Sequence, residues 1–128
     1  MDKIRQFEDL LAWQKARTLA QEVDAVVRSG CLARDFRLID QIRAATASVM
    51  ANVAEGFERS RPAEFQRFLS IAKGSCGEVR SHLYVALDRG YLSEAQFNTM
   101  RLKAAQTSQV IGALRRAVLR HLEAARSR

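Results

Sequence analysis

The sequence has little proline and little cysteine. Pro62 is the single proline among 128 residues of which 48% are hydrophobic, and this composition excludes both disorder and a proline-rich linker. Two cysteines, Cys31 and Cys76, are too few for a disulfide scaffold and lack the spacing of a metal site. Cys76 falls on an apolar helical stripe and is predicted to be a small core residue. The length predicts one domain over residues 1–128.

Long apolar runs are also missing. No uncharged run is longer than residues 44–54, which is well short of the roughly 20 residues that cross a bilayer. The first residues contain no apolar signal region. We therefore expect a soluble cytoplasmic protein with no membrane partner.

Acidic residues are scarce relative to basic ones, and the imbalance is local. The net charge is +7 with a sequence pI near 10.2. From residue 101 onward there are seven basic residues and one acid, Glu123, so this segment carries six of the seven net positive charges. A basic stripe is typical of proteins that bind polyanions such as RNA or DNA. A solvated helix face with a basic tail explains the charge equally well.

Apolar residues recur every three or four positions along the whole chain, which is the period of an amphipathic helix. The pattern predicts helices over about residues 10–28, 35–57, 62–88 and 94–125. Their short connections place consecutive helices antiparallel. The predicted fold is therefore all-α, an up-down-up-down four-helix bundle.

Several residues predict where these helices begin and end. Asp9 and Ser60 are candidate N-caps of the first and third helices, since their side chains can accept hydrogen bonds from free first-turn amides. Gly30 is expected to end the first helix. The segment Ser93-Glu-Ala-Gln96 is a capping-box pattern for the fourth helix.

Glycines also occur inside the third predicted helix. Gly74 and Gly77 each cost roughly 1 kcal/mol relative to alanine in a helix interior, so we expect a packing reason for them.

Catalytic patterns are weak. The nearest match to a di-iron Glu-x-x-His motif is Glu78 and His82, which are four residues apart, while His121 is isolated. Ser75 and Cys76 have no histidine and acid at a recognisable spacing, and the chain has no glycine-rich phosphate loop. We predict no enzymatic activity, no cofactor, no metal and no small-molecule substrate.

Polar residues accompany the apolar stripes of the second and third helices. Glu55 and Arg59 are spaced to form an i,i+4 ion pair. The set could be a buried or interfacial hydrogen-bond network that fixes helix register, or it could contact a ligand directly. Its members are Gln41, Arg43, Ser48, Asn52, Glu55, Arg59, Lys73, Ser75 and Glu78.

Three ordered segments resemble those of a known family, the four-helix-bundle proteins often encoded by intervening sequences within 23S ribosomal RNA genes. The resemblance runs from Phe7 to about Val118. The segments are Phe7-x-x-Leu10-x-x-Trp13-Gln-Lys-Ala16, then Gln41-Ile-Arg-x-Ala45-x-x-Ser48-x-x-x-Asn52-x-Ala-Glu-Gly56-x-x-Arg59, and Phe65-x-x-Phe68-Leu-x-Ile-Ala72-x-Gly-Ser75-x-x-Glu78.

The resemblance implies homopentameric rings, nucleic-acid binding through a basic surface, and a relation to accessory subunits of diversity-generating reverse transcriptases. It implies no catalytic residues. The chain has Cys31 and Arg34 where many members have Pro-x-x-Glu, and it has Cys76-Gly77 in place of Leu-Ala.

Assembly is also predicted from the residues themselves. On the second helix Ala44, Ala47, Ala51 and Ala54 lie off the apolar line that runs from Ile42 to Val53. A small bundle needs one buried face per helix, so a second apolar face predicts a homo-oligomer. The number five is implied by the resemblance alone.

These observations predict a non-catalytic, oligomeric nucleic-acid-binding protein. Contacts are expected from Arg115, Arg116 and Arg120 first, and from Arg59 and Arg61 second. Because aromatic residues are only 7% of the chain, binding should favour the backbone of structured RNA over base sequence. The alternative is a structural or adaptor protein that binds another protein, with the basic surface serving solubility.

Overall fold

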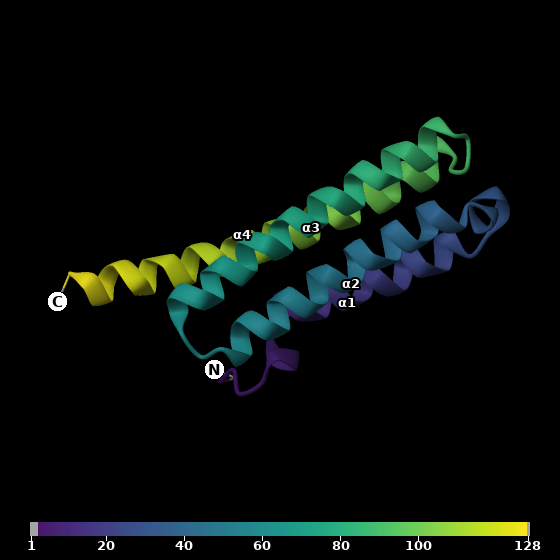
Figure 1. The fold of residues 1–128 in the computed structure, drawn as a ribbon. Coiled ribbons are helices and arrows are strands. Elements are labelled where there is room, and N and C mark those ends of the chain that lie inside the picture. The colour runs from purple at the N-terminus through teal and green to yellow at the C-terminus, as the bar shows by residue number, and fades with distance from the viewer. Residues whose placement is uncertain (1–2, 128) are drawn as a thin grey trace.

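The computed structural model describes residues 3–127. Within this range all regular secondary structure is helical, without strands, and the chain forms the predicted antiparallel four-helix bundle (Figure 1). The elements in chain order are η1 (Phe7–Asp9), α1 (Leu11–Val27), η2 (Gly30–Arg34), α2 (Phe36–Glu58), α3 (Pro62–Asp88) and α4 (Glu94–Arg126).

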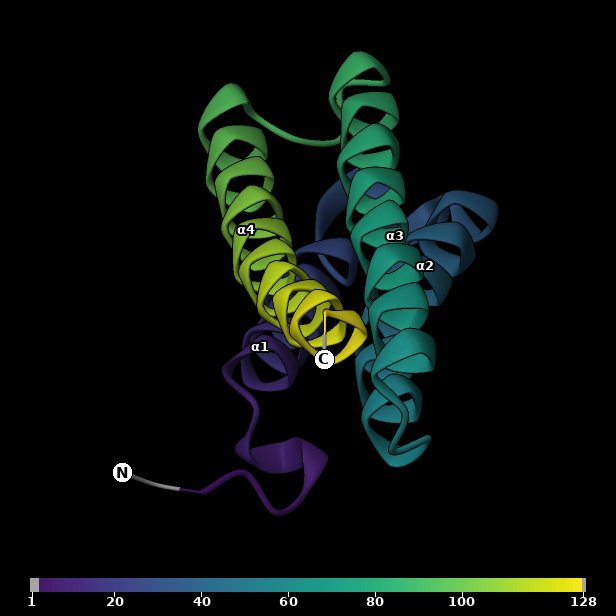
Figure 2. The same ribbon diagram turned by 90° about the vertical axis from the view of Figure 1, so that its left-hand side faces the viewer.

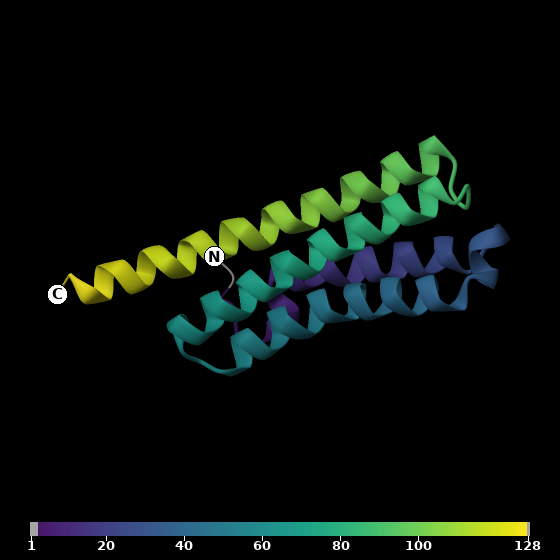
Figure 3. The same ribbon diagram turned by 45° about the horizontal axis from the view of Figure 1, so that its top comes forward.

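Consecutive helices form two hairpins, α1–α2 and α3–α4, which lie side by side (Figures 1 and 2). The most extensive contacts join α2 to α3 and α3 to α4, whereas α1 packs less extensively on its two neighbours. The lengths explain part of this difference, since α1 has 17 residues and α4 has 33. The C-terminal turns of α4 therefore extend past the rest of the bundle (Figure 3).

The predicted helix boundaries agree with the structure to within about a residue, but two predicted caps are wrong. Asp9 does not cap α1, because its carboxylate accepts hydrogen bonds from the N–H groups of Arg5 and Gln6 at 3.0 and 3.2 Å and so stabilises the short helix η1. Leu10 is the N-cap residue of α1 instead. Neither η1 nor η2 was predicted from the sequence.

Ser60 does not cap α3 either. It has a left-handed backbone with φ of 62° in the turn between α2 and α3, and Arg61 is the N-cap residue of α3. The predicted capping box of α4 is confirmed, since Ser93 Oγ accepts from the N–H of Gln96 at 3.1 Å and Gln96 Oε1 accepts from the N–H of Ser93 at 3.0 Å. Gly30 follows α1 with φ of 61°, as a helix-ending glycine does.

The core consists of two clusters of buried side chains along the bundle. One, between α1, α2, α3 and α4 near η2, includes Leu19, Ile42, Leu83 and Phe97. The other, toward the chain ends, includes Cys76, which is completely buried as predicted. Burial raises the pKa of the Cys76 thiol to about 11, and the nearby cations Arg80 and Lys73 oppose this effect.

Asp35 connects α2 to the turn between α3 and α4. Its carboxylate accepts from the N–H of Leu38 at 3.2 Å, from Tyr91 Oη at 2.9 Å and from Arg89 Nη1 at 2.8 Å. These bonds, led by the one from Leu38, lower the pKa of Asp35, and the hydrogen bond to Asp35 raises the pKa of Tyr91. One side chain therefore caps α2 and links the two hairpins.

The glycines differ in what surrounds them. At Gly56 an added Cβ would lie 2.8 Å from the Cβ of Phe68, so this glycine lets α2 and α3 approach closely. At Gly74 an added Cβ would meet nothing within 4 Å, and at Gly77 it would meet only the Arg80 guanidinium at 4.0 Å. The expected packing reason for Gly74 and Gly77 is therefore absent within the described part of the chain.

Candidate nucleic-acid interface

The three arginines predicted to bind nucleic acid lie on the C-terminal half of α4. Arg116 and Arg120 are exposed and stand one helical turn apart, while Arg115 is half-buried. The Arg115 Nε atom is buried and has no hydrogen-bond partner among residues 3–127. Within the same residues, no carboxylate lies within 4 Å of any of the three guanidinium groups. Their charges are therefore available to an external anion.

Lys73 of α3 reaches the same region. Its Nζ lies 3.5 Å from the position that a Cβ on Gly112 would occupy, and Arg116 Nη1 lies 3.4 Å from that position. The absent side chain of Gly112 thus leaves room for two cations from different helices. Lys73 was not predicted among the nucleic-acid contacts, because its proximity to Arg116 depends on the register of α3 against α4.

Further cations continue along this seam. Arg80 lies two helical turns from Lys73 on α3, and Arg120 lies one turn beyond Arg116 on α4. We call Arg80, Lys73, Arg116 and Arg120 the cation line. In the described range none of these four residues, nor Arg115, has an ion pair.

The two secondary candidates lie elsewhere. Arg59 is held by Glu55 at 2.9 Å and by Glu64 at 3.9 Å, and its guanidinium stands over the Phe68 ring at 5.2 Å from the centroid. The predicted Glu55–Arg59 pair is thus confirmed, and its hydrogen bond raises the pKa of Arg59. The charge of Arg59 is already partly neutralised, so it offers less to a phosphate than the α4 arginines do.

Arg61 borders a pocket of about 580 Å³ at the end of the bundle where α4 extends beyond α3. The walls are mainly apolar, with Phe57 and Phe65 in edge-to-face contact at 6.0 Å between ring centroids. Cations stand at the rim of this end pocket. Its lining includes Arg5, Phe57, Arg61, Pro62, Phe65, Val118 and His121.

The predicted polar set on α2 and α3 divides into separate groups. Its central group joins the two helices: Ser48 Oγ and Ser75 Oγ are 2.8 Å apart, and Asn52 Nδ2 donates to Ser48 Oγ at 3.0 Å and to the Ser48 carbonyl at 2.8 Å. These atoms are part-buried and bonded to one another. The arrangement fits the interpretation that this group fixes the register of α2 against α3.

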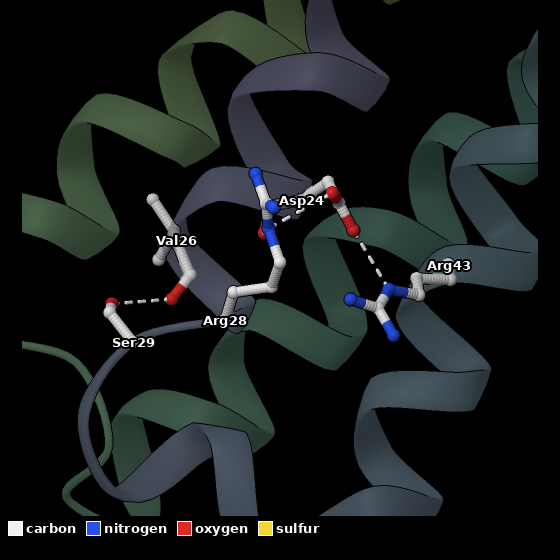
Figure 4. A network of polar contacts seen from close by, with 5 residues as sticks. All are labelled: Asp24, Val26, Arg28, Ser29 and Arg43. Atoms are coloured by element: carbon white, nitrogen blue, oxygen red, sulfur yellow. Dashed lines mark hydrogen bonds and ion pairs between the residues drawn. The ribbon is translucent and has the colours of Figure 1, made fainter.

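Arg43 belongs to a different contact, between α1 and α2. Its Nε donates to Asp24 Oδ1 at 2.8 Å, and Asp24 also pairs with Arg28 at 3.2 Å (Figure 4). Close by, Ser29 Oγ donates to the Val26 carbonyl at 2.8 Å (Figure 4). Arg43 therefore fastens α1 to α2 and does not join the α2–α3 group.

Gln41 and Glu78 are exposed and line a shallow groove of about 350 Å³ between α2 and α3. Ala44, Ser48 and His82 line the same groove. The groove combines small and polar side chains. We call it the α2–α3 groove.

Two other features are absent from the described residues, a metal cluster and a membrane-spanning helix. Residues 3–127 contain no group of three or more His, Cys, Asp or Glu side chains arranged to hold a metal ion. Over the same residues, no helix is both long and apolar enough to span a bilayer.

Comparison with known families decides which proteins the chain is related to. The profile of the family described as 23S rRNA-intervening sequence protein matches residues 8–113. The chain belongs to this family. The resemblance inferred from the three sequence segments is thereby confirmed, while the relation to reverse-transcriptase accessory subunits stays a prediction.

The fold of this family member is also found in a solved structure. A crystal structure of a protein of unknown function from the S23 ribosomal protein family of Bacteroides thetaiotaomicron is similar, with a TM-score of 0.75 and 18% sequence identity. The similarity covers 83% of this chain and 96% of that chain. At this identity the likeness establishes the fold alone. No curated protein matches the chain.

Proposed function

We propose that the protein is a non-catalytic nucleic-acid-binding protein that acts as an oligomer and prefers structured RNA. The observation that carries the proposal is the cation line, in which basic side chains from two helices share one seam without ion-pair partners in the described range. Lysine and arginine that replace counterions on phosphates provide most of the affinity of sequence-independent binding. Sparse exposed aromatic residues favour backbone contacts over base stacking.

An exposed alanine face on α2 supports the oligomer. Ala44, Ala47 and Ala51 are exposed, and no charged residue occurs from residue 44 to residue 54. A helix face of this kind can approach another helix closely, and a ring requires such a patch to meet a different patch on its neighbour. Repeating the cation line in each subunit would raise affinity through avidity without new contacts. The number of subunits, five by family resemblance, is part of the proposal.

A salt titration of binding to a structured RNA hairpin tests the nucleic-acid proposal. The wild-type protein should bind at about 50 mM salt, and the logarithm of its affinity should fall linearly with the logarithm of salt concentration. Replacing Arg115 and Arg116 together by glutamine should reduce the slope by about 0.7–0.9 for each phosphate that the variant no longer neutralises. Lys15→Gln on α1 is the matched control, because it removes an exposed cation that lies between α1 and α4 rather than between α3 and α4.

The titration has two outcomes that oppose the proposal. One is no binding by the wild-type protein at about 50 mM salt. The other is a slope that changes equally for the arginine variant and for Lys15→Gln, which would indicate that only net charge matters.

The α2–α3 groove supports a second candidate function, an adaptor that binds another protein. This groove presents Gln41, Glu78 and His82 beside Ala44, and the carboxylate of Glu78 would repel phosphates, so a polypeptide fits it better than a nucleic-acid backbone does. Affinity purification from the native host with and without nuclease separates the two functions. A protein partner that survives nuclease favours the adaptor, while recovery of RNA alone favours the first proposal.

A further inference from the structure

The cation line contains one point where two positive charges are packed together. Lys73 comes from α3 and Arg116 from α4, and both lie over Gly112. We infer that these two side chains form a cradle for a single backbone phosphate of the bound RNA. This inference rests on the proposed function and makes it specific, because it names the residues that anchor one phosphate.

The geometry suits a shared ligand. Lys73 Nζ and Arg116 Nη1 lie within 3.5 Å of one common point, the position of the missing Cβ, so the two nitrogens are separated by at most twice that distance. A phosphate placed above this point can accept from each nitrogen through a different oxygen, at the roughly 2.8 Å of a charge-assisted hydrogen bond. Arginine presents a fork of donors and lysine a compact charge, so the pair can hold the phosphate from two sides.

The electrostatics also call for an anion. Within residues 3–127 neither Lys73 nor Arg116 has a carboxylate within 4 Å, so no ion pair in the described chain offsets their mutual repulsion. Arg80 adds a further positive charge along α3. Like Lys73, it lies close enough to the Cys76 thiol for its charge to oppose the rise in the pKa of that thiol. Next to Arg116, Arg115 keeps a buried Nε without an acceptor. A bound phosphate relieves this concentration of unpaired positive charge.

Gly112 keeps the cradle open. The residue is buried in the middle of α4, where glycine is a poor helix former. Its missing side chain gives the Lys73 stem, whose Cδ lies 3.7 Å from the Cβ position, a path across α4 to Arg116. A methyl group there would be in van der Waals contact with both cationic groups, at 3.4 and 3.5 Å, and would occupy the point that they share. Gly112 thus costs helix stability but leaves room for the two cationic side chains to lie together.

Binding of an RNA hairpin to four variants tests the cradle. Lys73→Gln and Arg116→Gln should each weaken binding about tenfold at low salt, in line with the removal of one charge-assisted hydrogen bond. Because the phosphate is shared, the slope reductions of the two single variants should not add, and the double variant should lose about 0.7–0.9 in slope in total, which is the loss of one phosphate contact. Gly112→Ala should also weaken binding while its Tm stays at or above that of wild type, since alanine favours the helix and the added Cβ would meet only the flexible side chains of Lys73 and Arg116. Lys15→Gln is the control and should change binding least.

The same measurements separate failure of the cradle from failure of the proposed function. Absence of salt-dependent RNA binding by the wild type overturns both. Normal wild-type binding that Lys73→Gln and Gly112→Ala leave unchanged overturns the cradle alone. Slope reductions that add in the double variant mean two separate phosphates and also overturn it. Calorimetric titration with inorganic phosphate adds a further arm: binding that Lys73→Gln abolishes, with RNA affinity intact, assigns the cradle to free phosphate instead of RNA.

Discussion

Replacement of Gly56 by alanine measures how closely α2 and α3 must approach. The added Cβ would lie 2.8 Å from Phe68 Cβ, 3.0 Å from Phe65 Cδ1 and 3.3 Å from the Phe65 carbonyl oxygen. Carbon atoms in contact prefer separations of about 3.5–4.0 Å. Phe68 Cβ and the Phe65 carbonyl are fixed to the backbone of α3, so a side-chain rotation cannot relieve these contacts. The two helices would have to move apart.

Two opposing effects decide how much Gly56→Ala changes the free energy of unfolding. Alanine favours a helix interior over glycine by about 1 kcal/mol. Overpacking a core costs about 1–3 kcal/mol and occasionally more. The backbone contacts place Gly56 at or above the upper end of that range. After subtraction of the gain in helix propensity, we expect Gly56→Ala to lower the free energy of unfolding by about 2 kcal/mol or more, which corresponds to a fall in Tm of about 7 °C or more for a chain of this size.

Gly74→Ala is the matched comparison. Gly74 also lies inside a helix, but it is exposed and an added Cβ would meet nothing within 4 Å. Only the helix-propensity gain remains, so this variant should be more stable by about 0.5–1 kcal/mol. Thermal unfolding followed by circular dichroism gives both values, provided that all proteins are measured at one concentration, since assembly would make Tm depend on it.

These two variants can contradict the argument that the close approach of α2 and α3 limits stability at Gly56. If Gly56→Ala raises Tm as much as Gly74→Ala does, the close approach of α2 and α3 does not limit stability. Helix content at low temperature should remain near that of wild type in both variants. A lower helix content in Gly56→Ala would place the destabilisation in the helix itself rather than in its packing.

Three other perturbations give further tests. The hydrogen bond from the N–H of Leu38 is the main cause of the lowered pKa of Asp35, so the stabilisation by this carboxylate is present at neutral pH and is lost as pH falls through its folded-state pKa. Asp35→Asn should therefore reduce the drop in Tm between pH 7 and pH 3. An unchanged drop would contradict this. Since burial raises the Cys76 pKa to about 11, a thiol reagent at pH 8 should label only the exposed Cys31 until denaturant is added, and two labels on the native protein would be inconsistent with the core. Ala47→Gln should lower the mass found by light scattering without changing helix content, whereas a wild-type monomer at micromolar concentration would exclude the proposed oligomer.

Local patterns predicted the elements of the fold well because each helix carries a strong signal of its own. The apolar period defined all four helices, and the Ser93–Gln96 box and the Glu55–Arg59 pair were found where their spacing placed them. Helix caps were harder to predict, because an acidic or hydroxyl side chain before a helix can also form hydrogen bonds with backbone groups outside that helix. Asp9 stabilises the preceding 3₁₀ turn, and the left-handed backbone of Ser60 has no signature in its neighbours.

The candidate site was harder to predict because it depends on helix register. Four glycines lie inside helices, and no sequence pattern distinguishes one from another. The structure separates Gly56 and Gly112, which lie against other side chains, from Gly74 and Gly77, where an added Cβ would meet open space or only a guanidinium at 4.0 Å. An interior glycine therefore does not show by itself whether another side chain lies close to it, because that depends on the opposite helix. For the same reason, Lys73 could not be assigned to Arg116 from the sequence.

The positions of the two proposed surfaces allow assembly and binding to coexist. The alanine face is on α2, while the cation line follows the seam between α3 and α4, and α2 packs on α3 and α1 but not substantially on α4. Contact between subunits through α2 would therefore leave the cradle at Lys73 and Arg116 exposed. Each subunit could then contribute its phosphate contacts separately, and the whole assembly would gain affinity from their number. Disruption of the α2 interface should weaken RNA binding only because fewer subunits are joined, while the phosphate contacts of each subunit stay unchanged.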